Sequence, residues 1–149
     1  MLGINNFDWT PNSNFLCPLG SHIRKVNPRN DLGRQTVNRF RILRRGIPYG
    51  EDVDADPNGE RGLLFVCYQS SISSGFSFIQ QTWANSPGFF NDGAGLDAVM
   101  GQTNSQPTVE MKGLFPQDAN RPLALNGVNR FVVPKGVSVR QYACHDSSY

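Results

Sequence analysis

The chain has 149 residues, of which 38% are hydrophobic and 17% charged, and its formal net charge is +2. This length suits one ordinary domain, and so small a net charge does not indicate nucleic acid as a partner. No apolar run approaches the roughly 18 residues of a membrane span, and the first residues lack the charged and apolar regions of a signal peptide. We therefore expect no membrane partner and leave the compartment open.

Charge and cysteine are unevenly placed along the chain. Eight of the fourteen basic residues lie between Arg24 and Arg45, where Asp31 is the only acid, and an acidic segment follows at residues 51–60. This pattern predicts a local anion site rather than a basic face. The three cysteines have no zinc-binding spacing, and Cys67, which lies in an apolar run, is predicted to be a buried thiol.

The first 45 residues predict mostly irregular structure followed by one strand. Prolines and glycines recur through residues 1–35, with a short helical turn expected around Ser21–Lys25. Apolar and basic residues alternate over residues 37–45, which predicts a strand that ends near the turn at residues 47–50.

The remainder predicts a strand, a helix and a final strand. Residues 62–69 form a continuous apolar run, typical of a central strand covered on both faces. Apolar residues spaced by three or four from Ile72 to Trp83 predict an amphipathic helix, capped by Ser70 or Ser71 and ended before Pro87. Residues 86–126 read as loop, and residues 130–133 as a short strand. The order predicts an α+β fold with helices on one face of an antiparallel sheet.

Two places carry candidate chemistry. His22 lies in a turn-rich segment beside several cations, and a haem requires one neutral imidazole for its iron and cations for its propionates. Arg44 and Arg45 end the first expected strand, where a permanent cation could stabilise a developing anion. The alternative for these residues is a structurally satisfied histidine and a solvated strand end.

The acidic segment matches the first half of a calcium loop, but position twelve, where a bidentate glutamate belongs, is Phe65. We interpret it as a solvated loop. The GxSxG pattern of a serine nucleophile is absent, and two histidines give little support to a catalytic triad.

Four blocks of sequence together resemble one family, the dye-decolourising (DyP-type) haem peroxidases, and above all its fungal members. CPLGSHIRKVNPR resembles the proximal-histidine segment and FRILRRGIPYG the distal-arginine segment. GLLFVCYQSSISSGFSFIQQTWAN and GLDAVMGQ follow in the family's order. The resemblance covers roughly residues 5 to 136.

The resemblance implies a ferredoxin-like fold of the dimeric α+β barrel type, here incomplete. It further implies haem b (iron protoporphyrin IX) as cofactor, and hydrogen peroxide with dyes or phenolic donors as substrates. Matched position by position, it makes His22 the axial iron ligand and Arg44 the distal arginine. It also places the following residues in the haem site: Leu63 and Phe65 lining the distal pocket, Arg29 at a propionate, and Asp97 accepting a hydrogen bond from His22.

The chain also departs from the family pattern. The distal aspartate of the family's GxxDG motif has no counterpart here, and neither has the N-terminal domain, which is therefore an expected partner. We expect residues 1–136 to be a partial C-terminal domain. Residues 137–149 do not match the family and are interpreted as a non-native tail, with translated intron sequence as the hypothesis.

Two functions follow from these expectations. The first is a haem peroxidase of the DyP type, with low turnover expected of this chain alone because the proton shuttle is missing. The second is a non-catalytic fragment that binds haem or another anion through its basic segment.

Overall fold

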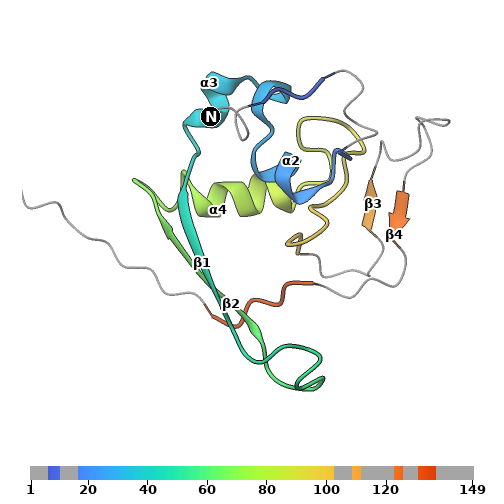
Figure 1. Ribbon diagram of the computed structural model, residues 1–149. Coiled ribbons are helices and arrows are strands. Elements are labelled where there is room, and N and C mark those ends of the chain that lie inside the picture. The colour runs from blue at the N-terminus through green and yellow to red at the C-terminus, as the bar shows by residue number, and fades with distance from the viewer. Residues whose placement is uncertain (1–6, 11–16, 103–108, 112–122, 126–130, 137–149) are drawn as a thin grey trace, which may run out of the picture.

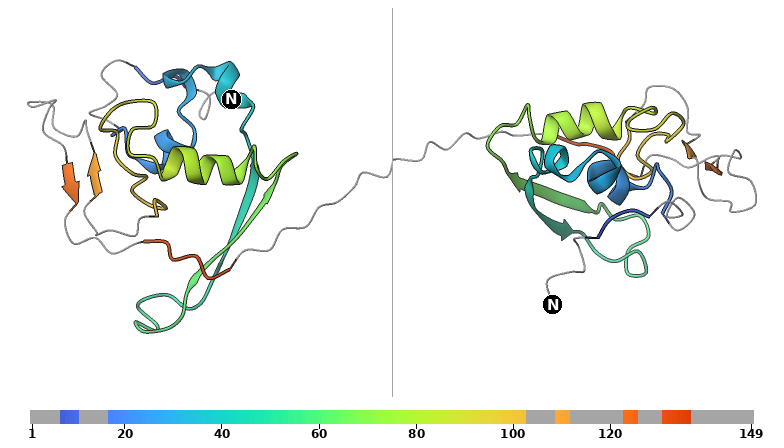
Figure 2. Two further views of the ribbon diagram at one scale, coloured as in Figure 1. Left: turned by 180° about the vertical axis from the view of Figure 1, so that it is seen from behind. Right: turned by 90° about the horizontal axis from the view of Figure 1, so that it is seen from above.

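The structure, a computed structural model, describes residues 7–10, 17–102, 109–111, 123–125 and 131–136. It has two main regions, a helical body and a long two-stranded hairpin that extends away from it (Figures 1 and 2). A small ribbon of β3 (Val109–Met111) and β4 (Leu123–Leu125), paired antiparallel, lies on the other side of the body. Within these described ranges, no helix is long and apolar enough to cross a membrane.

The helical body is built from short segments packed on one longer helix. The short segments are α2 (His22–Val26), η1 (Arg29–Asp31) and α3 (Arg34–Asn38), and the longer helix is α4 (Phe76–Phe78) continued by a π-helical stretch, η2 (Ile79–Ala84). The core between them consists of the buried Val37, Ile79 and Trp83, surrounded by partly buried hydrophobic residues. The ring of Trp83 stacks on Phe89 at 5.1 Å between centroids. Burial of these large side chains stabilises the body.

Polar pairs fix the position of α2, which forms where the sequence predicted a helical turn. The guanidinium of Arg24 donates to both carboxylate oxygens of Asp31, at 2.7 and 3.0 Å. Asn30 exchanges two hydrogen bonds with the backbone of Trp9, at 2.7 and 2.9 Å. Because a bidentate ion pair and a reciprocal amide pair both restrict orientation, α2 and η1 are held as one unit.

The expected strand over residues 37–45 is wrong in its first half. Residues 34–38 form α3, and β1 begins only at Leu43 and runs to Tyr49. The cause is tertiary packing, since Val37 is buried in the core and Phe40, three residues on, packs against the same cluster. This is helical spacing. The strand passes through Pro48, which is compatible with a strand that pairs along one edge only among the described residues.

The second strand forms as predicted, but its expected burial is wrong. β2 (Gly62–Tyr68) pairs antiparallel with β1, from Leu43 opposite Tyr68 to Tyr49 opposite Gly62. Nearly every residue of both strands is exposed. An apolar run typical of a doubly covered strand therefore lies, in this chain, on a hairpin that the described residues leave largely uncovered.

The predicted amphipathic helix forms, with a different start. It begins at Phe76, whose backbone N–H donates to Oε1 of Gln69 at 2.6 Å, so that Gln69 does what was expected of Ser70 or Ser71. The side chain of Gln69 crosses close to Gly75, where an added Cβ would lie 2.0 Å from the same oxygen. The helix ends at Ala84, before Pro87, as predicted.

Other expectations have mixed outcomes. Residues 131–136 contain no strand, so the strand expected at residues 130–133 is wrong for the part that is described. The acidic loop is exposed almost throughout. Cys67 is half-buried rather than buried, and burial raises the pKa of its thiol. The proposed tail, residues 137–149, lies outside the described residues.

Candidate functional site

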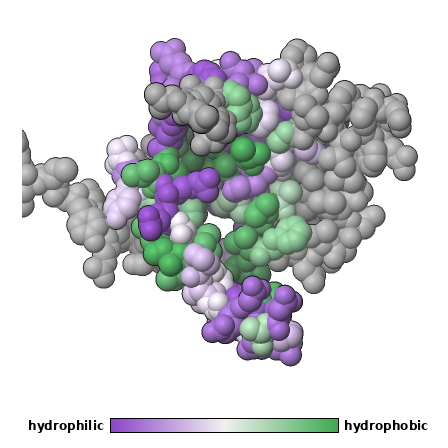
Figure 3. Space-filling model, viewed as in Figure 1, coloured by the Kyte–Doolittle hydropathy of each residue, from purple (hydrophilic) through white to green (hydrophobic). Residues whose placement is uncertain are grey.

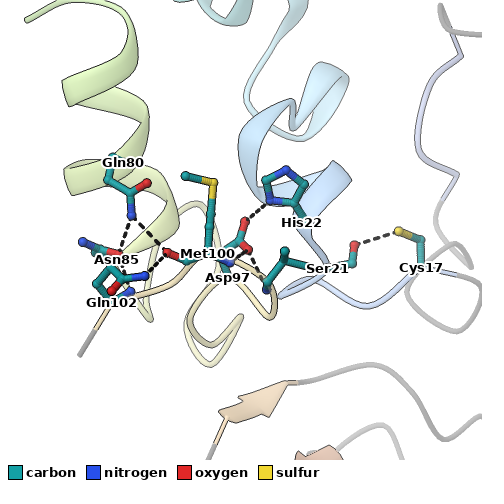
Figure 4. A network of polar contacts seen from close by, with 9 residues as sticks. Cys17, Ser21, His22, Gln80, Asn85, Asp97, Met100 and Gln102 are labelled. Atoms are coloured by element: carbon teal, nitrogen blue, oxygen red, sulfur yellow. Dashed lines mark hydrogen bonds and ion pairs between the residues drawn. The ribbon is translucent and has the colours of Figure 1, made fainter. Parts of the chain in front are cut away.

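The structure brings His22 and Asp97 together although they are 75 residues apart in the sequence. His22 is the first residue of α2, and its Nδ1 lies 2.9 Å from Oδ2 of Asp97 (Figure 4). The side chain of Asp97 is fully buried, whereas that of His22 is 34% exposed. The carboxylate therefore lies beneath a ring that reaches the surface.

Asp97 is held by its own turn and by two neighbouring segments. Its Oδ1 accepts the backbone N–H groups of Val99 and Met100, each at 2.9 Å. This is a local turn of the kind that aspartate favours. Its backbone N–H donates to the carbonyl of Ala84 at 2.9 Å, and the next amide, of Ala98, donates to Gly20 at 3.0 Å. Asp97 thus connects the end of η2 to the start of α2.

An amide network fastens the segment after Asp97 to η2. Nε2 of Gln80 donates to the carbonyl of Met100 at 3.1 Å and to Oδ1 of Asn85 at 3.0 Å. The same Asn85 oxygen accepts the backbone N–H of Gln102 at 2.8 Å (Figure 4). None of these amides was singled out from the sequence, because side chains so far apart are brought together only by the fold.

The histidine–carboxylate pair has a defined chemistry. With Oδ1 occupied by two amides, Oδ2 is the acceptor that faces Nδ1 of His22, and in a neutral ring with its proton on Nδ1 the other nitrogen has the lone pair. This arrangement, in which one nitrogen donates to a buried carboxylate and the other is available at the surface, is that of metal-ligating histidines. The donor set of the site therefore fits an iron that needs one axial imidazole.

Lys25 is a functional candidate that the sequence reasoning missed. Its side chain is completely buried, and its Nζ donates to the carbonyl of Ser86 at 2.6 Å. Burial lowers the pKa of Lys25 to about 8, an effect that the charge of Asp97 partly offsets. The available signal was its spacing, because a residue three positions after His22 in a helix lies on the same face.

The hairpin carries three predicted site residues on one face. In the register of β1 and β2, Arg44 lies opposite Cys67, Gly46 opposite Phe65, and Pro48 opposite Leu63. Because directly opposed and alternate residues share a face, Arg44, Leu63 and Phe65 point to the same side, and Arg45 points to the other. The ring of Phe65 lies 5.6 Å from that of Phe76 at the start of α4, so this face turns toward the helical body.

Arg29 packs its guanidinium against an aromatic ring near the start of the described chain. It is buried, with a left-handed backbone conformation (φ of 51°), and its guanidinium lies 4.0 Å from the ring centroid of Phe7. Burial lowers the pKa of Arg29, and the positive charges of Arg34 and Arg41 lower it further. The charges of Cys17 and Asp8 act in the opposite direction.

The surface is hollowed between the hairpin and the rest of the chain (Figure 3). Two depressions, of about 410 and 400 Å³, lie at the tip of the hairpin beside Pro48 and next to Trp9 and Phe90. His22 lines neither of them. Neither depression is therefore the place of a macrocycle bound at His22.

The fold is α+β, and it places a carboxylate-bonded histidine on the helical body and an arginine on the hairpin face that turns toward the body. Residues 11–92 match the sequence family described as "Dyp-type peroxidase, C-terminal". The chain therefore belongs to the DyP-type peroxidase family, whose members are haem enzymes, and it represents an incomplete ferredoxin-like C-terminal domain.

Individual relatives agree with this assignment. The chain is 41% identical to the dye-decolorizing peroxidase msp1 of Mycetinis scorodonius over 89% of its own length and 29% of the relative's. It is 40% identical to AauDyP1 of Auricularia auricula-judae over 80% of this chain and 26% of that protein. A structure of an ancestral D-type dye-decolorizing peroxidase superposes with a TM-score of 0.72 at 40% identity, covering 88% of this chain and 31% of the other. The chain thus spans less than a third of these relatives.

Proposed function

We propose that this chain supplies the haem-ligating part of a DyP-type peroxidase, with His22 as the axial ligand of haem b. The observation that supports this most is the 2.9 Å contact between Nδ1 of His22 and the buried Asp97. A lone surface histidine would not need a fully buried carboxylate that is itself fixed by two backbone amides. Asp97 orients the ring and increases its basicity toward the iron.

Arg44, Leu63 and Phe65 form the opposite wall of the proposed site. They share the hairpin face that turns toward the body. Arg44 has a permanent positive charge and would bind and polarise hydrogen peroxide, while Leu63 and Phe65 exclude water around it. Bound haem would supply the redox chemistry by which peroxide oxidises dyes or phenolic donors.

Arg29 is proposed as a cation for one haem propionate. Its guanidinium is buried, and burial and the charges of two other arginines lower its pKa, so a nearby anion would stabilise the charged form. We further propose that a separate part of the full-length peroxidase, including its N-terminal domain, covers the exposed hairpin and contributes the acid–base group that this chain lacks.

A second candidate function is haem binding without turnover. The exposure of both hairpin strands favours it, since Arg44 would then face water instead of a closed distal pocket. Both candidate functions require His22 to bind the haem iron. They differ in whether Arg44 promotes the reaction with hydrogen peroxide.

Haem titration of the purified chain tests the ligation of iron by His22, which both candidate functions require. We expect a Soret band that shifts on ligation, and that is lost or displaced in His22→Ala. His145→Ala removes the only other histidine and is the matched control, expected to leave the spectrum unchanged. Identical spectra for both variants and wild type would contradict axial ligation by His22.

Steady-state oxidation of a phenolic donor by hydrogen peroxide separates the two candidates. A peroxidase should exceed free haem at equal concentration and lose that excess in Arg44→Gln, with Arg45→Gln on the other face as control. A rate equal to that of free haem, with a normal Soret band, supports the binding function and excludes turnover by this chain.

A further inference from the structure

Lys25 occupies an unusual position beside the proposed iron ligand. It lies on α2 three residues after His22, and its side chain is 0% exposed, which is rare for lysine. Its Nζ donates to the carbonyl of Ser86, and the rings of Phe89 and Phe90 lie 5.5 and 5.8 Å away. Among the described residues, these groups and the charge of Asp97 form its surroundings.

Lys25 and Asp97 both donate hydrogen bonds to backbone carbonyls at or just after the end of η2. Nζ of Lys25 bonds the carbonyl of Ser86, and the backbone N–H of Asp97 bonds the carbonyl of Ala84, two residues earlier at the end of η2. A buried ammonium and a buried carboxylate therefore lie in one low-dielectric region, where charges interact more strongly than in water.

The carboxylate of Asp97 thus interacts with two groups. It accepts a hydrogen bond from His22, and the positive charge of Lys25 attracts it. We propose that Lys25 is a positioning residue whose buried charge limits how strongly Asp97 draws the Nδ1 proton of His22, and so sets the electron-donating power of the axial ligand. This inference rests on the proposed role of His22 as that ligand.

The direction of the effect follows from electrostatics. With Lys25 charged, part of the negative potential at Asp97 is compensated, and the imidazole stays close to neutral. Without that charge, Asp97 attracts the proton more strongly, and the ring gains imidazolate character that favours ferric over ferrous iron. Because the pKa of Lys25 is about 8, the ammonium form predominates at neutral pH.

The test uses the haem-loaded chain with Lys25 changed in three ways. Lys25→Gln removes the charge but retains a donor for Ser86, Lys25→Met removes the charge and retains side-chain length, and Lys25→Arg retains the charge. Lys135→Gln, at an exposed lysine, is the matched control for loss of one positive charge. Two readouts are used at pH 7, the ferric/ferrous midpoint potential and the iron–histidine stretching frequency in the ferrous protein.

We expect Lys25→Gln and Lys25→Met to change the reduction equilibrium about tenfold in favour of ferric haem, about 59 mV for a one-electron couple, and to raise the stretching frequency. Lys25→Arg and Lys135→Gln should retain the wild-type values. Unchanged values in both neutral variants, with normal Soret bands, overturn this inference and leave the proposed function intact. Absence of a His22-dependent Soret band in the wild-type chain overturns both.

Discussion

The helical body and the hairpin are both rich in large apolar side chains, yet they bury them to different extents. Trp83 in the body is 1% exposed, whereas Leu64 on the hairpin is 57% exposed. The proposed proximal residues, His22 and Asp97, belong to the body and are fixed by contacts within the chain. The proposed distal residues belong to the hairpin, whose strands are exposed. The chain alone therefore fixes the positions of the proximal residues more firmly than those of the distal residues.

The largest expected effect is on the body. Trp83→Ala removes a buried ring that packs against Phe40, Phe78 and Phe89, and should lower the free energy of unfolding by about 3–5 kcal/mol. Urea denaturation followed by circular dichroism measures it. A loss below about 1 kcal/mol would show that this cluster is not the core of the isolated chain.

The buried Lys25 gives the body a pH dependence with a defined sign. Burial lowers the pKa of Lys25 from 10.5 to about 8, so between these values the unfolded chain binds more protons than the folded chain. The free energy of unfolding should therefore rise as pH increases through this window, by about 3 kcal/mol in total.

The Lys25→Met variant is the reference for this measurement, because its free energy of unfolding should not show this rise with pH. The difference between wild type and variant also removes the contribution of Cys67, whose raised pKa acts in the opposite direction. Parallel pH profiles for the two proteins would contradict the assignment.

A smaller effect is expected where the hairpin joins the body. Gln69→Leu removes the acceptor for the backbone N–H of Phe76 and should cost about 1 kcal/mol of unfolding free energy. Ser70→Ala is the control, since the serine expected to cap the helix does not do so. If Ser70→Ala were the more damaging change, the helix start given by the structure would be incorrect.

The sequence predicted the local elements better than the burial of their side chains. α2, β2 and the end of the long helix were predictable because turn-forming residues, apolar runs and proline act locally. The end of α3, from Val37 on, was mistaken for a strand because the burial of Val37 depends on Ile79 and Trp83, over forty residues away. Family resemblance pointed to His22 and Asp97, but the buried Lys25 required the packed structure.

The smallest effect on the unfolding free energy is expected for a substitution on the hairpin. This substitution tests directly whether the hairpin is less buried than the helical body. Leu64 lies in the middle of β2 on the face opposite Arg44, and its exposure predicts that Leu64→Ser changes the unfolding free energy by no more than about 0.5 kcal/mol. The measurement is repeated at two protein concentrations. A loss above about 2 kcal/mol at low concentration would mean that the chain covers its own hairpin, whereas a loss only at high concentration would mean that copies cover one another. Insensitivity at both concentrations is what we expect if the apolar sequence of this strand serves a surface that other parts of the full-length protein cover.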